Sequence, residues 1–290
     1  MASLQRVQFL NLLILTGLGS YSAFIYLDPV KIALLLLFGM GLEHLLIYLR
    51  YGRIRHFSFS ALSTTLGVVL MMVSVEYWIY LFAVGAGLLQ KHFLRYRDRH
   101  IFNPSNFAIV ATMLLFYRQA HTVLGQLGDS YVLMSVVLLL GAAVLIRAGR
   151  GLIPPAFVAV YLTLQYLLIV QTDPVLFMED VVLRFYSVSF IVFILFMLTD
   201  PQTTPGGLLG ELLFAAAVAG LSTLLDYAVG FRVQHLFLAL FAVSAARPLF
   251  DGSAGEDTKS HIVKWVVFFL SIVTIMIIEL RPPYYFAMDV

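Results

Sequence analysis

The sequence contains no cysteine and few charged residues. Without cysteine, the chain itself cannot form disulfides, thiolate metal sites or cysteine-ligated iron–sulfur clusters. Charged residues make up 12% and hydrophobic residues 61%, whereas soluble domains carry about 25% charged residues. Such a chain cannot cover a water-facing surface and is typical of an integral membrane protein. The net charge of +2 is too small to indicate a nucleic-acid partner.

Several patterns of catalytic and metal-binding residues are also missing. The sequence has no phosphate-binding glycine-rich loop, no histidine pair with metal or haem spacing on a convincing span, and no nucleophile–base arrangement. We therefore predict no metal ligand and no catalytic residue in this chain, and we exclude hydrolase and kinase chemistry.

Long apolar runs dominate the sequence. A helix needs roughly 17–25 apolar residues to cross a bilayer, whereas barrel strands alternate over short segments. We expect an all-α, polytopic membrane protein, a single domain over 1–290 with about 10–11 transmembrane helices. The first run is expected to be retained, not cleaved as a signal peptide, and the run at 104–117 is short for a full span. The predicted spans are 9–27, 30–49, 58–75, 77–93, 104–117, 130–147, 153–171, 181–199, 208–229, 232–250 and 262–280.

Lysine and arginine predict the orientation of these spans. With a cytoplasmic N-terminus, thirteen of the eighteen basic side chains fall inside and five outside, as the positive-inside rule requires. We therefore expect a multi-pass protein of the cell (inner or cytoplasmic) membrane, with the lipid bilayer as a partner. The basic run from Lys91 to His100 is interpreted as an anchor that also contacts lipid headgroups; a phosphate-bearing cofactor or an acidic partner is the alternative.

Two short polar breaks, Asn103-Pro104 and Asp200-Pro201, separate long apolar runs on the predicted cytoplasmic side. Asn or Asp at an N-cap followed by proline indicates a helix start. A helix start carries free N–H groups and a partial positive charge that bind an electron-rich ligand. One break in each half also suggests two pseudo-repeated halves that meet at interrupted helices.

The side chains around both breaks are the candidate ligand site. Simple capping needs only Asn103 and Asp200, and capping alone is the alternative interpretation. The additional polar side chains exceed what two caps require and favour a shared ligand site: Ser105, Asn106, Thr203 and Thr204.

Other polar residues lie within the predicted spans, where ionisable side chains face a bundle interior or water. Glu43 and His44 are interpreted as a proton relay or, equally well, as part of a salt bridge with Arg50. Asp226 is expected near the outer end of its span, in contact with water. The segment 60–67 predicts close helix packing, and its hydroxyls would line the same cavity if it faces the breaks.

The order of these features resembles the NqrB/RnfD family, the flavin-carrying membrane subunits of the sodium-pumping NADH:quinone reductase and Rnf electron-transport complexes. The resemblance covers residues 58–251, with 1–57 as a two-helix N-terminal extension and 252–290 as an additional C-terminal helix. The stand-alone form is most similar to the UnbU-like branch. The matching segments are the small polar span 60–72, a span ending in Lys91, Phe-Asn-Pro at 102–104, Phe-Met-Leu-Thr-Asp-Pro-Gln-Thr-Thr-Pro at 196–205, and Arg-Pro-Leu-Phe-Asp at 247–251.

The resemblance implies a bound flavin, riboflavin or FMN. The electron-transport subunits carry FMN esterified to threonine in an external loop; here that loop is 118–130, Thr122 lacks the motif, and the Gly-Ser-Ala-Gly segment at 252–255 is predicted inside. We therefore expect no covalent FMN. The family's other, non-covalent riboflavin site lies near the two breaks, so Asn103 and Asp200 carry over. His100 stands where a family asparagine would be, and a basic run replaces the family's glycine-rich approach.

The resemblance thus implies a membrane redox protein that holds a non-covalent flavin and transfers electrons within or across the bilayer. Its partners would be a redox protein or a quinone, and it would form an oligomer or a subunit of an electron-transport oxidoreductase. A transporter of a flavin or a natural product with the same fold is the alternative, and an assembly subunit without a cofactor is the third class.

Overall fold

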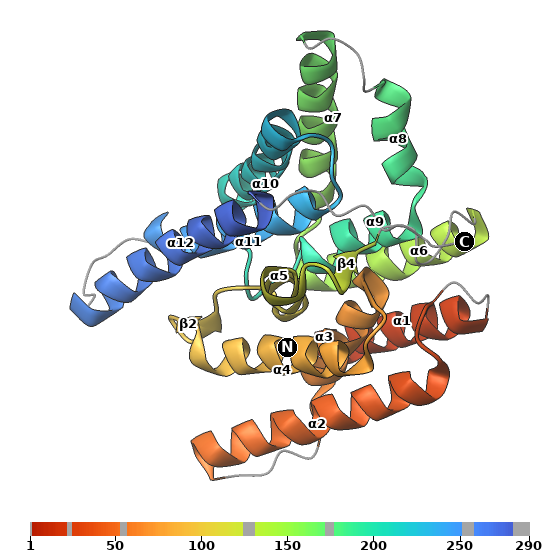
Figure 1. Ribbon diagram of the computed structural model, residues 1–290, viewed down its shortest axis with the longest axis vertical. Helices are drawn as coiled ribbons and strands as arrows, with labels where there is room; N and C mark the ends of the chain where they lie inside the picture. The colour runs from red at the N-terminus through yellow and green to blue at the C-terminus, as the bar shows by residue number, and fades with distance from the viewer. Residues whose placement is uncertain are drawn as a thin grey trace.

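A computed structural model describes residues 2–21, 25–52, 57–123, 131–171, 177–250 and 258–280. Within these ranges the protein is all-α, with two short β pairings (Figure 1). The segment 251–257 and residues 124–130 of the loop predicted to be external lie outside the described ranges. The helices are α1 (Ala2–Tyr21), α2 (Pro29–Tyr51), α3 (Phe59–Met71), α4 (Tyr77–Phe93), α5 (Pro104–Phe116), α6 (Tyr131–Ala148), α7 (Ile153–Gln171), α8 (Met178–Tyr186), α9 (Val188–Val192), the π-helix η1 (Phe193–Met197), α10 (Leu208–Val229), α11 (Gln234–Phe250) and α12 (Thr258–Glu279).

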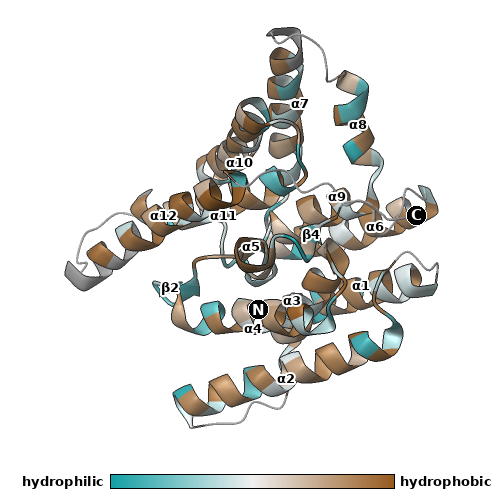
Figure 2. Ribbon diagram, viewed as in Figure 1, coloured by the Kyte–Doolittle hydropathy of each residue, from teal (hydrophilic) through white to brown (hydrophobic). Residues whose placement is uncertain are grey.

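Several helices are long and apolar enough to cross a membrane. In the described ranges α2, α6 and α10 meet this criterion singly, and α8 with the following helix to Met197 meets it as a bent pair. Hydrophobic residues cover most of the helical ribbon (Figure 2), and large apolar side chains such as Leu139 and Ile146 remain more than 70% exposed. These features indicate a membrane-embedded protein.

Most helices follow the predicted apolar runs, with three corrections. Helix α1 covers Ala2–Tyr21 instead of 9–27. The run at 58–75 divides into α3 and the strand β1 (Met72–Ser74). The run at 181–199 is not one straight span, because α8 and α9 meet at Ser187 with a bend of 75°. A π-helix then leads into the Asp200 segment. A wide π-turn inside a helix is frequent at functional sites.

Helix α5 lies centrally and packs against α3, α4, α11 and α12 (Figure 1). Two glycines permit this close packing. A Cβ at Gly87 of α4 would lie 2.6 Å from the Pro104 carbonyl oxygen, and a Cβ at Gly67 of α3 would lie 2.4 Å from Ser105 Oγ. The start of α5 is therefore fixed against both neighbouring helices.

The N-terminal helices are part of the same core. Helix α1 packs on α3 and α6, and Asn11 Nδ2 donates to the Leu140 carbonyl over 2.8 Å. Helix α2 packs on α3 and α4. The first two helices therefore pack directly against helices of the segment 58–251.

The buried glutamate of α2 corrects one prediction. Glu43 does not pair with Arg50 or His44; its carboxylate lies 2.5 Å from Lys91 Nζ and 3.0 Å from His92 Nε2 of α4. His44 Nδ1 lies 2.7 Å from the Met40 carbonyl of its own helix. The expected Glu43–His44 relay is therefore replaced by a link between α2 and α4.

Asp226 of α10 also differs from the expectation that it contacts water. It is 5% exposed, and its carboxylate accepts hydrogen bonds from Gln165 Nε2 at 2.6 Å and from the Arg232 backbone N–H at 3.1 Å. At the other end of α10, Glu211 pairs with Arg150 over 3.0 Å. Both carboxylates are held by partners from other segments, as the cost of a buried charge requires.

Two short antiparallel pairings complete the fold. β1 (Met72–Ser74) pairs with β4 (Ala120–Thr122), and β2 (Arg95–Tyr96) pairs with β3 (Arg99–His100). The β2–β3 hairpin turns through Arg97 and Asp98, both with positive φ, as a two-residue hairpin of mirror-image type requires. This hairpin delivers His100 to the start of α5.

Candidate functional site

The first wall of the site is the start of α5. Asn103 is the N-cap, and its Oδ1 accepts the backbone N–H groups of Ser105 and Asn106, each at 3.1 Å. Pro104 occupies the first helical position, where no N–H is needed. The predicted helix start is thus confirmed, but Asn103 satisfies these two N–H groups itself. The partial positive charge of the helix start remains at this end of α5.

The second wall is the segment at Asp200, and it corrects the prediction of a second helix start. Asp200 Oδ1 accepts the Gln202 N–H at 3.0 Å, and the Asp200 carbonyl accepts the N–H of Thr204 at 3.0 Å. These bonds close a single turn, and α10 begins only at Leu208, after Gly207 with φ 84°. Pro205 and two glycines separate the turn from the helix.

The two walls meet through side chains. Asn103 Nδ2 donates to Asp200 Oδ2 over 3.1 Å, and His100 Nε2 lies 3.4 Å from the same oxygen. The Asp200 and His100 side chains are only 12% and 11% exposed. Burial by itself would raise the pKa of Asp200, but the bonds from His100, Gln202 and Asn103 hold that pKa below its ordinary value. Asp200 is therefore an ionised carboxylate at neutral pH.

Two arginines from other segments donate hydrogen bonds to backbone carbonyls of the Asp200 turn. Arg99 of β3 donates to the Pro201 carbonyl, and Arg247 of α11 donates to the Gln202 carbonyl over 3.0 Å. Four of the basic side chains between Lys91 and His100 thus have partners inside the protein. Lys91 and His92 contact Glu43, Arg99 bonds to the turn, and His100 faces Asp200. This revises their interpretation as lipid contacts.

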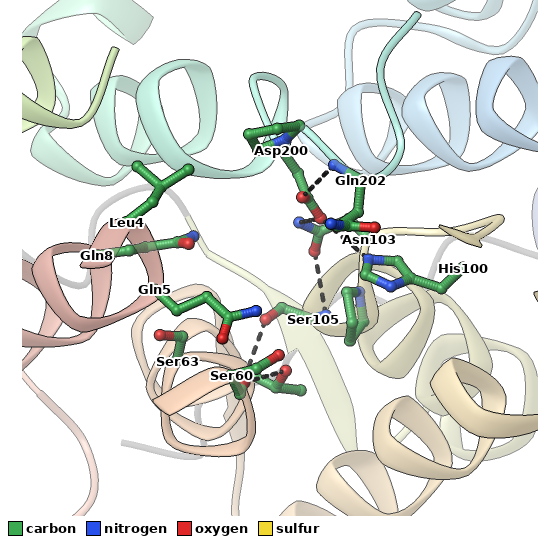
Figure 3. Close-up of a pocket in the computed structure, with 13 residues that line it drawn as sticks. Leu4, Gln5, Gln8, Ser60, Ser63, His100, Asn103, Ser105, Asp200 and Gln202 are labelled. Atoms are coloured by element: carbon green, nitrogen blue, oxygen red, sulfur yellow. Dashed lines mark hydrogen bonds and ion pairs between the residues drawn. The ribbon is translucent and has the colours of Figure 1, made fainter. Parts of the chain in front are cut away.

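A cavity of about 80 Å³ opens beside this meeting point. Asp200 and Gln202 lie above it, His100 on one side, and Gln5 and Gln8 of α1 on the opposite side (Figure 3). The hydroxyl-bearing face of α3 forms the floor of the cavity. The segment 60–67 therefore faces the two breaks, and its hydroxyls line the cavity, as expected for that case. The other polar lining residues are Ser60, Ser63, Thr64, Asn103 and Ser105.

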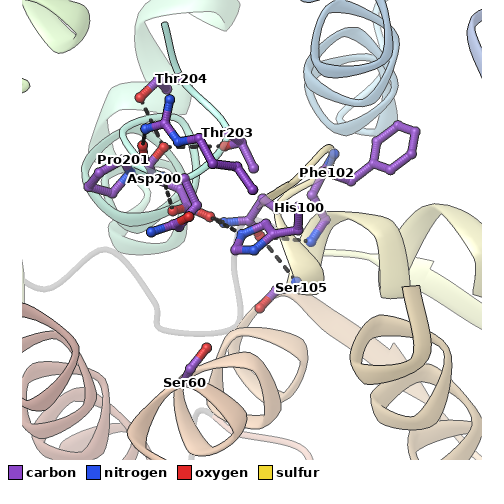
Figure 4. Close-up of polar contacts among 12 residues, drawn as sticks. Ser60, His100, Phe102, Ser105, Asp200, Pro201, Thr203 and Thr204 are labelled. Atoms are coloured by element: carbon purple, nitrogen blue, oxygen red, sulfur yellow. Dashed lines mark hydrogen bonds and ion pairs between the residues drawn. The ribbon is translucent and has the colours of Figure 1, made fainter. Parts of the chain in front are cut away.

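Three of the predicted site residues do not line this cavity. Asn106 is 1% exposed and donates to the Phe237 carbonyl of α11 over 3.1 Å. Thr203 and Thr204 bond back to the Asp200 carbonyl and lie on the side of the turn away from Ser105 (Figure 4). The structure thus brings together His100, Asn103, Ser105 and Asp200, and gives the other three internal hydrogen bonds.

The sequence analysis missed Gln202 and two further polar lining residues, both on α1. Gln5 and Gln8 are three residues apart and therefore share one face of α1, yet they precede the apolar run that defined the first span. Within the described ranges neither amide has a hydrogen-bond partner. Ser63 Oγ is likewise buried without a partner. Among the described residues, these three side chains have polar atoms available for a polar ligand.

In comparisons with known proteins, no protein-family model and no curated protein matches the chain. The resemblance to flavin-carrying subunits therefore stays a prediction that depends on the ordered sequence segments between 58 and 251.

Proposed function

We propose that this is a multi-pass protein of the cell membrane that binds one flavin, riboflavin or FMN, non-covalently and transfers electrons within or across the bilayer. The observation that carries the proposal is the convergence of Asn103 and His100 on Asp200 at a polar cavity. The same two breaks carry the resemblance to the NqrB/RnfD family. The proposal includes a cytoplasmic N-terminus, two related halves and about 10–11 transmembrane helices.

The residues at the cavity match the polar edge of a flavin ring, which presents carbonyl acceptors and one ring N–H. The ionised carboxylate of Asp200 would accept a hydrogen bond from the ring N–H. The amides of Gln5 and Gln8, which line the cavity, would donate to the ring carbonyls. The positive end of α5 lies beside the same cavity and would stabilise negative charge on the ring. When bound, the flavin supplies the redox chemistry, and these residues bind it, orient it and set its potential.

The size of the cavity limits how a flavin would bind. Enclosed ligand sites measure roughly 300–1,000 Å³, whereas this cavity measures about 80 Å³. Only the polar edge of the ring would enter, and the rest would lie outside the mouth. An electron partner, either a redox protein or a membrane quinone, would then have direct access to the exposed edge.

A transporter for a flavin or a natural product is the second candidate function. The 75° break between α8 and α9, followed by a π-helix, favours it, because transporters build their substrate sites from discontinuous helices. A small cavity would then be one state of a site that opens and closes.

The visible spectrum of the purified full-length protein separates these functions. The redox proposal expects flavin absorbance near one flavin per chain, released into solution by denaturation. A colourless protein that drives flavin uptake into vesicles would support the transporter. A colourless protein without uptake would contradict both and leave an assembly role.

A further inference from the structure

A second buried polar cluster lies at the end of α10 remote from Asp200. His235 at the start of α11 is 0% exposed. Its Nδ1 lies 2.6 Å from Asp226 Oδ1 of α10, and its Nε2 lies 3.3 Å from Glu279 Oε2 of α12. One imidazole thus stands between two carboxylates that come from two other helices.

The two ring nitrogens cannot both be satisfied by a neutral imidazole. A neutral ring has one N–H donor and one lone pair. Asp226 Oδ1 also accepts the Arg232 N–H at 3.1 Å, so it is an acceptor and Nδ1 must be the donor. In a neutral ring the Nε2 lone pair would then face a Glu279 oxygen at 3.3 Å, out of line for a hydrogen bond. A proton on Nε2 turns this repulsion into an ion pair.

Two arginines also face the two carboxylates, so the proton on His235 is added to a cluster that is neutral without it. Arg184 Nη1 lies 3.6 Å from Asp226, and Arg232 Nη1 lies 3.2 Å from Glu279. Each carboxylate already has one arginine, so protonated His235 brings the cluster to a net charge of +1. Among the described residues, the other polar side chains near the cluster come from α7, α11 and β4: Tyr161, Gln165, Gln234 and His121.

A polar cavity lies beside the cluster. This cavity of about 210 Å³ is lined by Arg232 and Gln234, which both bond to Glu279, and by His121 of β4. Met113 and Tyr117 at the end of α5 also line it. Helix α5 therefore runs from this cavity to the Asn103 site, a distance of about 20 Å for thirteen residues.

We propose that Asp226, His235 and Glu279 form a binding site for one exchangeable proton, held on His235 and reached through the cavity beside Arg232 and His121. The site does not depend on a flavin. Glu279 of α12 also accepts hydrogen bonds from Arg232, between α10 and α11, and from Gln234 of α11. The proton therefore also joins α12 to α10 and α11.

Nitrogen NMR of full-length protein labelled with ¹⁵N-histidine tests the proposal. The chain has seven histidines, and the signal lost in His235→Gln, or in His235→Asn if the first variant fails to fold, identifies the ring. We expect both nitrogens of His235 to be protonated at pH 7.5. In Glu279→Gln the ratio of charged to neutral ring at that pH should fall by about tenfold or more.

The matched control is Glu211→Gln, which removes a buried carboxylate from the other end of α10. It should leave the His235 signals unchanged. A His235 ring with a single protonated nitrogen at pH 6 would overturn the proposal, because the cluster would then be an ordinary set of buried hydrogen bonds. Equal effects of the Glu279 and Glu211 substitutions would also overturn it.

Discussion

Asn103 and Asp200 are 97 residues apart, and a hydrogen bond of 3.1 Å joins their side chains. Each side chain also organises its own backbone: Asn103 Oδ1 caps α5, and Asp200 Oδ1 accepts the Gln202 N–H. Each residue thus uses one atom for its own segment and another for the other break. A residue that acts only as a cap does not need this second bond. The bond between Asn103 Nδ2 and Asp200 Oδ2 therefore holds the two breaks together at the cavity.

Close packing at the start of α5 should be sensitive to one added methyl group. Gly87→Ala places a Cβ 2.6 Å from the Pro104 carbonyl, and such overpacking costs about 1–3 kcal/mol. The control is Gly85→Ala on the same helix, whose Cβ meets only Leu42 at 3.9 Å. Thermal unfolding in detergent should show a lower midpoint for the first variant alone. Equal midpoints would mean that α4 and α5 are not packed as described.

Both breaks should face the same side of the membrane. The chain has no cysteine, so single cysteines introduced at exposed Arg97 and Gly206 report directly on sidedness. We expect an impermeant thiol reagent to label both from the cytoplasmic side, and Glu76→Cys at the start of α4 from the outside. Labelling of Arg97 and Gly206 from opposite sides would contradict the fold, and labelling of both from outside would contradict the orientation alone.

The glutamines of α1 should contribute to ligand binding without supporting the fold. Their amides have no partner among the described residues, so Gln5→Leu and Gln8→Leu should each weaken flavin binding about tenfold and leave thermal stability nearly unchanged. Leu10→Ala, on an exposed face of the same helix, is the control and should not change affinity. Unchanged affinity in both glutamine variants would exclude α1 from the site.

The sequence predicted the helices well because apolar runs and proline caps act locally. Asn103-Pro104 starts a helix as expected, since the cap needs only the next three residues. The Asp200 turn was misjudged because Pro205 and Gly207, several residues later, decide where α10 begins. Glu43 pairs with Lys91, 48 residues away, and Asp226 bonds to Gln165, 61 residues away, and no local pattern identifies these two partners. Gln5 and Gln8 were missed because α1 meets the breaks only in the folded chain.

The central claim is that Asn103 and Asp200 hold one flavin together, and a double-mutant cycle on flavin affinity tests it most directly. A buried polar contact is worth about 1–3 kcal/mol when its partner is left unpaired, so Asn103→Ala and Asp200→Ala should each weaken binding roughly ten- to a hundredfold. Asn103→Asp and Asp200→Asn keep a capping oxygen, so they separate the ligand role from the cap, which by itself is worth about 1 kcal/mol. The account predicts that the double alanine variant loses less affinity than the sum of the singles, because the two groups share one ligand. Unchanged flavin content in both conservative variants, or losses that simply add, would contradict it.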